Sequence, residues 1–147
     1  MKAKLIAAFA ALLALAPAAL AAPAGVTLTV KIAPVIALPA GEAEVTVPVT
    51  LSLANESDQS VTLKSSNRCE IHIWNVTDSK DVGVENHNIC PMIYQPQSNP
   101  LAAGERQRAT KKITLRAAHY RAGETYTLHY RFWGIFTEAE FKANAAH

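Results

Sequence analysis

The sequence predicts an all-β protein, an antiparallel β-sandwich of about seven short strands with one disulfide. Along most of the chain apolar residues alternate with polar ones, and this period of two is the pattern of a half-buried strand. The alternating segments are short, turns rich in Gly, Pro and Asn separate them, and no long helical period interrupts them, which is typical of a sandwich. Sequential hairpins and Greek-key connections both fit this order.

The first two expected strands have the clearest alternation. Residues 26–32 place Val, Leu, Val and Ile on one face, and residues 45–53 repeat the pattern with three valines and two leucines. Pro48 has no amide hydrogen to donate, so the second strand is expected to lie at a sheet edge or to carry a bulge there. The polar residues 55–58 favour a turn, after which a third strand runs through residues 61–63.

The next expected strand runs from Cys69 to about Val76. Its alternation assigns one face to Cys69, Ile71 and Ile73 and the opposite, outward face to Glu70, His72 and Trp74. Trp133 is also expected at an outward position. Outward tryptophans are unusual, and two interpretations remain: the long loop covers them, or they mark a binding surface.

Two late strands follow similar turns at residues 102–105 and 121–124. The first strand directs Ile113 and Leu115 inward, and the second directs Tyr126, Leu128, Tyr130 and Phe132 inward. Tyr126 is either a tyrosine-corner-like anchor, whose hydroxyl bonds a neighbouring backbone group, or an ordinary core ring. The Ala-rich residues 137–146 are expected to form a helical turn or a frayed tail.

The first 21 residues have the organisation of a secretory signal peptide. Lys2 and Lys4 precede an apolar run over residues 5–15, and Ala-Leu-Ala at residues 19–21 forms a cleavage site. The run is too short to span a bilayer, which needs about 20 apolar residues. We therefore expect a soluble protein, secreted or periplasmic, whose single domain covers residues 22–147.

The charge balance argues against nucleic acid as a partner. The chain has 14 Lys and Arg against 12 Asp and Glu, and the two leader lysines account for the whole excess. A nearly neutral mature domain has no global attraction for polyanions.

Cys69 and Cys90 are expected to form a disulfide, because an even pair of cysteines in an exported protein is usually bridged. The alternative is a copper site in which His72, His87 and Met92 join the thiolates, although no recognised ligand spacing is present. No cofactor is expected.

Several segments together resemble the intracellular proteinase inhibitor (BsuPI-type) domain. They are Leu-Ala-Asn-Glu-Ser-Asp at residues 53–58 with Val-Thr-Leu at 61–63, Cys-Glu-Ile-His-Ile at 69–73, Leu-Ala-Ala-Gly-Glu at 101–105 and Ala-Gly-Glu-Thr-Tyr-Thr-Leu at 122–128. The resemblance covers about residues 45–133 and implies an immunoglobulin-like sandwich and proteinase inhibition. It carries over no inhibitory residue.

The longest irregular stretch, residues 77–101, contains the candidate binding loop. Loops of this length are usually functional or disordered. Cys90 would tether the loop, two prolines restrict its backbone, and a rigid, exposed segment is what a substrate-like inhibitor needs. The candidate residues are Pro91, Met92, Ile93 and Tyr94, with Met92 and Tyr94 as the specificity residues. The alternative is that these side chains pack on the core.

A second candidate surface is a basic face on the strand after Gly104. The even positions are all polar, and four are cationic: Arg106, Arg108, Lys112 and Arg116. They are expected to point outward together, and His129 and Arg131 would extend the face if the two late strands pair. The face would meet an acidic protein or an envelope polyanion, or it is a solvated face that prevents edge association.

No enzyme class is supported, because the chain has no Gly-x-Ser-x-Gly elbow, His-Glu-x-x-His helix or phosphate-binding loop. The expected function is therefore protein binding by an exported sandwich, with proteinase inhibition as its sharpest form. The alternative is a non-enzymatic accessory or structural module that binds an envelope component. Carbohydrate or metal binding, at Trp74 or at His72 and His87, is a third class.

Overall fold

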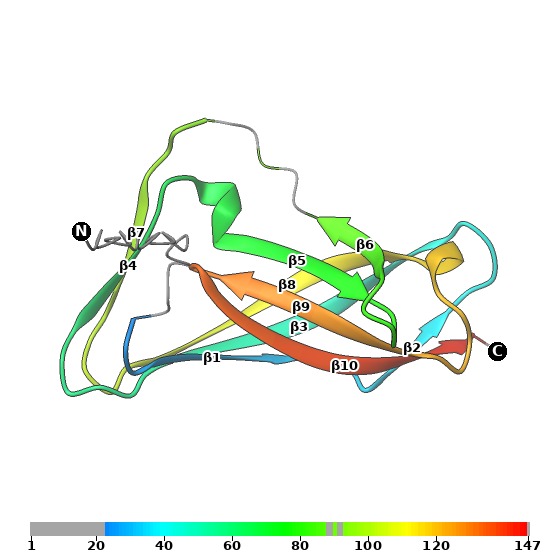
Figure 1. Ribbon diagram of the computed structural model, residues 1–147, viewed down its shortest axis with the longest axis horizontal. Helices are drawn as coiled ribbons and strands as arrows, with labels where there is room; N and C mark the ends of the chain where they lie inside the picture. Colours follow the sequence, from blue (N-terminus) through cyan, green and yellow to red (C-terminus); the bar gives the residue numbers. More distant parts are fainter. Residues whose placement is uncertain (1–22, 88–89, 91–92, 147) are drawn as a thin grey trace, which may run out of the picture.

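Alternation of apolar and polar side chains produces an almost entirely β structure (Figure 1). The structure is a computed structural model that describes residues 23–87, 90 and 93–146. Over these residues ten strands and two short 3-10 helices form, and the strands make two main sheets and a two-stranded ribbon. The all-β sandwich is confirmed, with ten strands in place of about seven.

Sheet 1 has three antiparallel strands in the order β1-β3-β8. They are β1 (Val26–Lys31), β3 (Glu44–Asn55) and β8 (Arg106–Arg116). β3 is central, and its register with β8 runs from Glu44 opposite Arg116 to Ala54 opposite Arg106. Within the described residues β8 is therefore an edge strand.

Sheet 2 has five strands in the order β2-β10-β9-β5-β6. They are β2 (Val35–Leu38), β10 (Ile135–Ala145), β9 (Thr125–Phe132), β5 (His72–Thr77) and β6 (Gly83–His87). Neighbours are antiparallel except β2 and β10, which are parallel. The strands are divided between the two sheets as in an immunoglobulin sandwich. β1, β3 and β8 take the places of strands A, B and E in one sheet, and β5, β9 and β10 take those of strands C, F and G in the other.

A ribbon of β4 (Val61–Ser65) and β7 (Gln97–Leu101) lies at one end of the sandwich, on the left in Figure 1. The 3-10 helix η1 (Arg68–Ile71) joins β4 to β5, and η2 (Ala117–His119) follows β8. The expectation of an irregular stretch over residues 77–101 is thus wrong in part, because β6 and β7 lie within it. Their Gly, Asn and Pro residues give a weak strand signal, and pairing with β5 and β4 overrides it.

The Asn55 side chain forms hydrogen bonds with two turns next to the ribbon, the turn after β3 and the turn after β7. Its side chain is 1% exposed, and its Nδ2 donates to the carbonyls of Gln59, Leu101 and Ala102 at 2.8, 3.3 and 3.0 Å. Its Oδ1 accepts from the amide and hydroxyl of Ser57 at 3.2 and 2.7 Å. The predicted turn after residue 55 is therefore confirmed, and its first residue is part of the core.

The core fills the space between sheets 1 and 2. Among the described residues, alternate positions of β3, β8 and β9 supply ten of its 25 buried apolar side chains, on the faces predicted. The largest fully buried apolar residues are Val49, Leu51, Leu53, Leu101, Ile113, Leu115, Val76, Leu128, Tyr130 and Phe141. Tyr126 satisfies both interpretations of its role, since its ring is 3% exposed and its hydroxyl accepts a hydrogen bond from the Arg121 amide at 2.7 Å.

Pro48 lies where β3 has one neighbour, as the missing amide hydrogen predicts. β1 pairs with β3 only from Thr50 onward, so residues 44–49 pair with β8 alone. The Ala117 amide donates to the Ala43 carbonyl, next to the Glu44–Arg116 pair. Because hydrogen-bonded and non-hydrogen-bonded pairs alternate along an antiparallel ladder, Pro48 and Lys112 form a pair without mutual hydrogen bonds. The proline nitrogen therefore points to the open side of β3.

The expectation of a helical turn or frayed tail over residues 137–146 is wrong. Residues in this segment form most of β10, which pairs with β9 on one side and β2 on the other. Alanine and glutamate favour helices in isolation. Here the burial of Ile135, Phe141 and Ala143 against the core outweighs that preference.

The expected faces of β5 are also reversed. Residues 69–71 are in η1 rather than in a strand, and this 3-10 turn shifts the alternation, so that Trp74 and Val76 point inward and are 7% and 0% exposed. The outward assignment of Trp74 is therefore wrong. Trp133 is half-buried, and with Gly134 it forms the turn between β9 and β10, in which both residues have positive φ, 52° and 79°.

Candidate functional site

The predicted disulfide joins η1 to the segment after β6. Cys69 and Cys90 are bonded across a sequence separation of 21, with their Cα atoms 5.6 Å apart. Asn67 caps η1 and accepts a hydrogen bond from the Cys69 amide at 3.3 Å. Because both sulfurs are in the disulfide, neither is a thiolate ligand, and the alternative of a copper–thiolate site is wrong.

Residues 93–96 are the described part of the candidate binding loop, and we call them the tethered loop. Pro91 and Met92 lie outside the described residues. Ile93 is 56% exposed and Tyr94 78% exposed, so neither side chain packs on the core. Beyond them the Gln95 amide donates to the Ser66 carbonyl at 3.1 Å, and Gln97 enters β7 opposite Ser65. The loop is thus held on both sides of its exposed apolar residues.

Phe136 of β10 is 71% exposed and lies at the same end of the molecule as this loop. A hollow of about 420 Å³ is lined by Tyr94, Lys64, Ser65 and Ser66, and the last three residues also line the hollow that contains Phe136. We call Ile93, Tyr94 and Phe136 the apolar patch. Of the five large apolar side chains that are exposed in the described residues, these three gather at one end.

Arg131 and His129 of β9 lie on the outer face of sheet 2, where both line a hollow together with Phe136. The Arg131 guanidinium is 5.6 Å from the ring centre of Phe136. His129 Nε2 is 2.9 Å from the Thr77 hydroxyl, and its Nδ1 is 3.5 Å from a carboxylate oxygen of Glu138. The expectation that these two residues extend the basic face is wrong, because β8 and β9 belong to different sheets.

The basic face lies on the outer side of β8. Arg106, Arg108, Lys112 and Arg116 are all exposed. The two terminal cations have acidic neighbours: Arg106 is 3.8 Å from Glu56 in the turn after β3, and Arg116 is 3.8 Å from Glu44 of β3. Among the described residues the two central cations, Arg108 and Lys112, have no ion pair.

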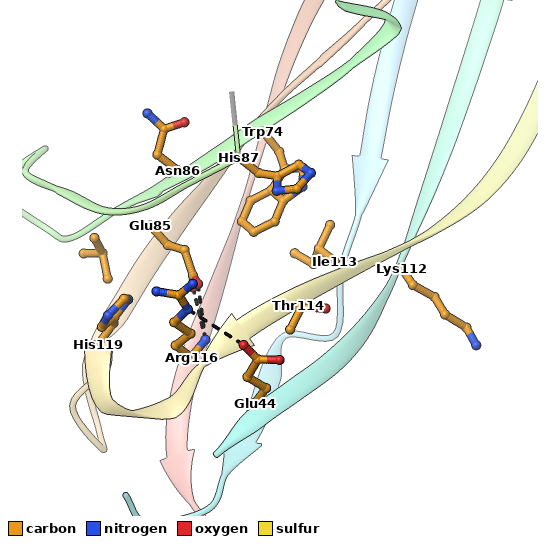
Figure 2. Close-up of a pocket in the computed structure, with 11 residues that line it drawn as sticks. Glu44, Trp74, Glu85, Asn86, His87, Lys112, Ile113, Thr114, Arg116 and His119 are labelled. Carbon is orange, nitrogen blue, oxygen red and sulfur yellow. Dashed lines mark hydrogen bonds and ion pairs between the residues drawn. The ribbon is translucent and has the colours of Figure 1, made fainter. Parts of the chain in front are cut away.

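A cleft of about 320 Å³ lies between the edges of the two sheets, where β6 of sheet 2 faces β8 of sheet 1 (Figure 2). Glu85 of β6 extends across it and accepts hydrogen bonds from the Tyr120 hydroxyl at 2.7 Å and the Arg116 amide at 3.3 Å. Farther in, the Trp74 and His87 rings stack, with their centres 5.4 Å apart. Sequence reasoning missed Glu85, because a single glutamate in an irregular stretch carries no recognisable signal.

Two groups between the sheets have shifted pKa values. Burial, and to a smaller extent the charge of Lys111, lower the pKa of His72 to about 4. The His72 ring stacks on Phe132 at 4.8 Å. Burial also raises the pKa of Tyr120 well above its usual value, and the hydrogen bond to Glu85 adds to the effect. Both shifts favour the neutral form.

The comparisons with known proteins found only distant structural similarity. No protein family and no curated protein matches the chain. A β-glucosidase from Listeria innocua in complex with glucose is 14% identical, with a TM-score of 0.43 over 82% of this chain and 16% of its own. A β-glucosidase from Erythrobacter marinus is 13% identical, with a TM-score of 0.43 over 80% and 15%. A β-glucuronidase of glycoside hydrolase family 2 is 9% identical, with a TM-score of 0.45 over 79% and 11%.

The chain therefore spans about a sixth or less of the length of these enzymes. No helix in the described residues is both long and apolar enough to cross a bilayer. The disulfide is compatible with an extracellular or periplasmic location.

Proposed function

We propose that this protein is exported and acts by binding another protein through the apolar patch, and that proteinase inhibition is the form of this function that the loop suits best. The observation that carries the proposal is the exposure of Ile93 and Tyr94 in a segment held on both sides. The proposed partner is a secreted protease.

The loop supports binding because it lowers the entropic cost of association. The disulfide at Cys90 and the Gln95–Ser66 hydrogen bond attach the segment to the domain at two points, and attachment of this kind reduces the conformational freedom that a segment loses on binding. Tyrosine is among the residues that contribute most to protein interfaces, and Tyr94 is more than three-quarters exposed. Phe136 adds a second aromatic ring to the same end of the molecule, so a partner would bury several apolar groups together.

Export is supported by the leader at residues 1–21 and by the disulfide. A leader places the domain in an oxidising compartment, where a disulfide persists. The resemblance to the proteinase inhibitor domain agrees with the proposed activity.

The test is a titration of secreted serine and cysteine proteases with oxidised protein that begins at Ala22. We expect stoichiometric inhibition of at least one protease, weakened about tenfold or more in Tyr94→Ala and Ile93→Ala. Val82→Ala is the matched control, since Val82 is 58% exposed but lies in the β5–β6 turn. Absence of inhibition at micromolar concentrations, with folding and disulfide intact, would overturn the inhibitor proposal.

The second candidate, an envelope accessory module, is favoured by the basic face. Arg108 and Lys112 are exposed cations without ion pairs in the described residues. Such a module would bind isolated cell envelopes with a salt dependence that Arg108→Ser and Lys112→Ser reduce, whereas Tyr94→Ala would leave the binding unchanged.

A further inference from the structure

The open edge of β8 has the geometry of a strand acceptor. We propose that residues 108–114 of β8 bind an extended segment of a protein partner as an added strand, and that this segment alternates acidic and apolar residues. The proposal concerns a different surface from the apolar patch and does not depend on proteinase inhibition.

The hydrogen bonds at the end of β8 determine which main-chain groups face the open edge. The Ala117 amide donates to the Ala43 carbonyl next to β3 at 2.9 Å. The Arg116 amide donates in the opposite direction, to the Glu85 carboxylate at 3.3 Å, and Figure 2 shows Glu85 reaching this end of β8. Because main-chain direction alternates along a strand, the amides and carbonyls of residues 108, 110, 112 and 114 also point away from β3.

These main-chain groups have no strand partner within the described part of the chain. β8 stands at the end of the order β1-β3-β8, and its pairing with β3 uses the odd positions from Gln107 to Leu115. Of the main-chain amides of β8, only that of Arg116 donates a hydrogen bond to Glu85. An open run of this kind is the template to which extended peptides add in β-augmentation.

The cleft beside β8 accounts for the apolar half of the proposed partner. Alternate side chains of an added strand would point toward the sandwich interior. There the cleft presents the half-buried Val84 side chain and the His87 ring, which stacks on Trp74, with the buried Ile113 at its wall. Glu85 lies at the far end and would limit the added strand to residues 108–114.

The basic face accounts for the acidic half. The other side chains of the added strand would lie beside the outward residues of β8, and opposite charges on neighbouring strands stabilise a sheet. Arg108 and Lys112 lie within the open run and have no ion pair in the described residues, whereas Arg106 and Arg116 outside it already have glutamate neighbours. A second copy of β8 would place cations against cations, so this edge favours a foreign acidic strand.

The test uses two seven-residue peptides, capped at both ends, with the same composition of four Glu and three Val. In one the residues alternate, and in the other the three Val are adjacent. Binding is followed by chemical shifts and hydrogen exchange of the protein's backbone amides. We expect the alternating peptide to bind at least tenfold more tightly and to slow exchange at the amides of Arg108, Thr110, Lys112 and Thr114.

Main-chain pairing is tested separately from charge. Thr110→Pro removes an amide that faces the open edge but leaves the pairing with β3, whereas the control Thr110→Val keeps the amide. We expect about a tenfold loss of affinity in the first and little change in the second. An alternating peptide N-methylated on the amides of one edge should also lose binding, which tests the same point without altering the protein.

Three results would overturn the proposal. If both peptides bound equally, and if neither Thr110→Pro nor N-methylation weakened the binding, charge attraction alone would explain it. Shifts confined to the tethered loop would place the site elsewhere. Dimerisation through β8 would make a second copy the occupant. Because Tyr94→Ala should leave peptide binding unchanged, failure here is distinguishable from failure of the inhibitor proposal.

Discussion

Replacement of Tyr126 by Phe should destabilise the domain although it leaves the core apolar surface in place. The ring is 3% exposed, and its hydroxyl accepts a hydrogen bond from the Arg121 amide at 2.7 Å and lies 3.3 Å from a carboxylate oxygen of Glu124. These contacts hold the turn at residues 121–124 against the start of β9. The substitution removes the hydroxyl and leaves the ring packing almost unchanged.

The expected cost is about 1 to 1.5 kcal/mol. A hydrogen bond contributes about 1 kcal/mol net, and an amide that loses its partner costs more when it is shielded from water. Arg121 is exposed, so water replaces part of the lost bond and the cost stays near the lower end. For a domain of this size, the corresponding fall in Tm is about 3 to 6 °C.

Urea unfolding followed by tryptophan fluorescence would measure the difference, with the slope m expected to be unchanged. Tyr130→Phe is the matched control. Its ring is 2% exposed, but its hydroxyl is 3.4 Å from His72 Nδ1, a weak contact, and its loss should cost less than about 0.5 kcal/mol. If Tyr126→Phe were as stable as the wild type, or if both variants lost the same stability, the anchoring role would be refuted.

Three further predictions concern acid stability, the cleft and the disulfide. Because the folded pKa of His72 is about 4 against 6.5 for a free side chain, the unfolded chain binds a proton first as pH falls. Stability should therefore drop between about pH 6.5 and 4 by about 1 to 2 kcal/mol, after allowance for solvent screening of a half-buried ring, and His72→Asn should remove this drop in urea unfolding. Glu85→Ala leaves the buried Tyr120 hydroxyl without its acceptor and should cost about 1 to 3 kcal/mol in the same assay. Replacing Cys69 and Cys90 together by Ser should cost about 3 kcal/mol, because the bond closes a loop with a sequence separation of 21.

Each of these predictions has a control or an opposing outcome. The exposed His119, changed to Asn, should keep the acid sensitivity of the wild type, and an unchanged pH profile in His72→Asn would contradict the role of burial. Glu85→Gln keeps an acceptor oxygen and should cost less than the alanine variant. A double serine variant as stable as the wild type would mean that the cross-link does not constrain the unfolded chain.

Period-two alternation was enough to predict the strands that form the centre of the sandwich. From Val47 to Leu53 in β3 and from Tyr126 to Phe132 in β9 every second residue is apolar, and the same residues are buried. The turn at Asn55 was predictable because its side chain bonds its own backbone locally. Local chemistry of this kind is visible in a sequence because it needs no partner from elsewhere in the chain.

The missed elements depend on distant partners. β10 has a helix-favouring composition and is a strand because β9 and β2 flank it. The reversal at Trp74 follows from η1, where a single 3-10 turn moves the next strand out of phase with the preceding pattern. Tyr94 and Phe136 likewise lie at the same end of the molecule through tertiary structure alone. Alternation predicts that a strand has two faces, but the preceding turn determines which face is inward.

The free edges of the sheets explain both Pro48 and the proposed strand acceptor. Alternation identified the outward side chains of β8, but it does not show which strands pair with the main chain of β8. That information comes from the register: β1 ends before Pro48, so proline is tolerated there, and β8 has β3 on one side only. On β8 the same even positions carry both the outward cations and the unpaired amides. A strand that pairs with this edge therefore also lies beside the cations. A variant that removes only the charge of Lys112 and a variant that removes only the amide hydrogen of Thr110 should each weaken the same complex, independently of each other.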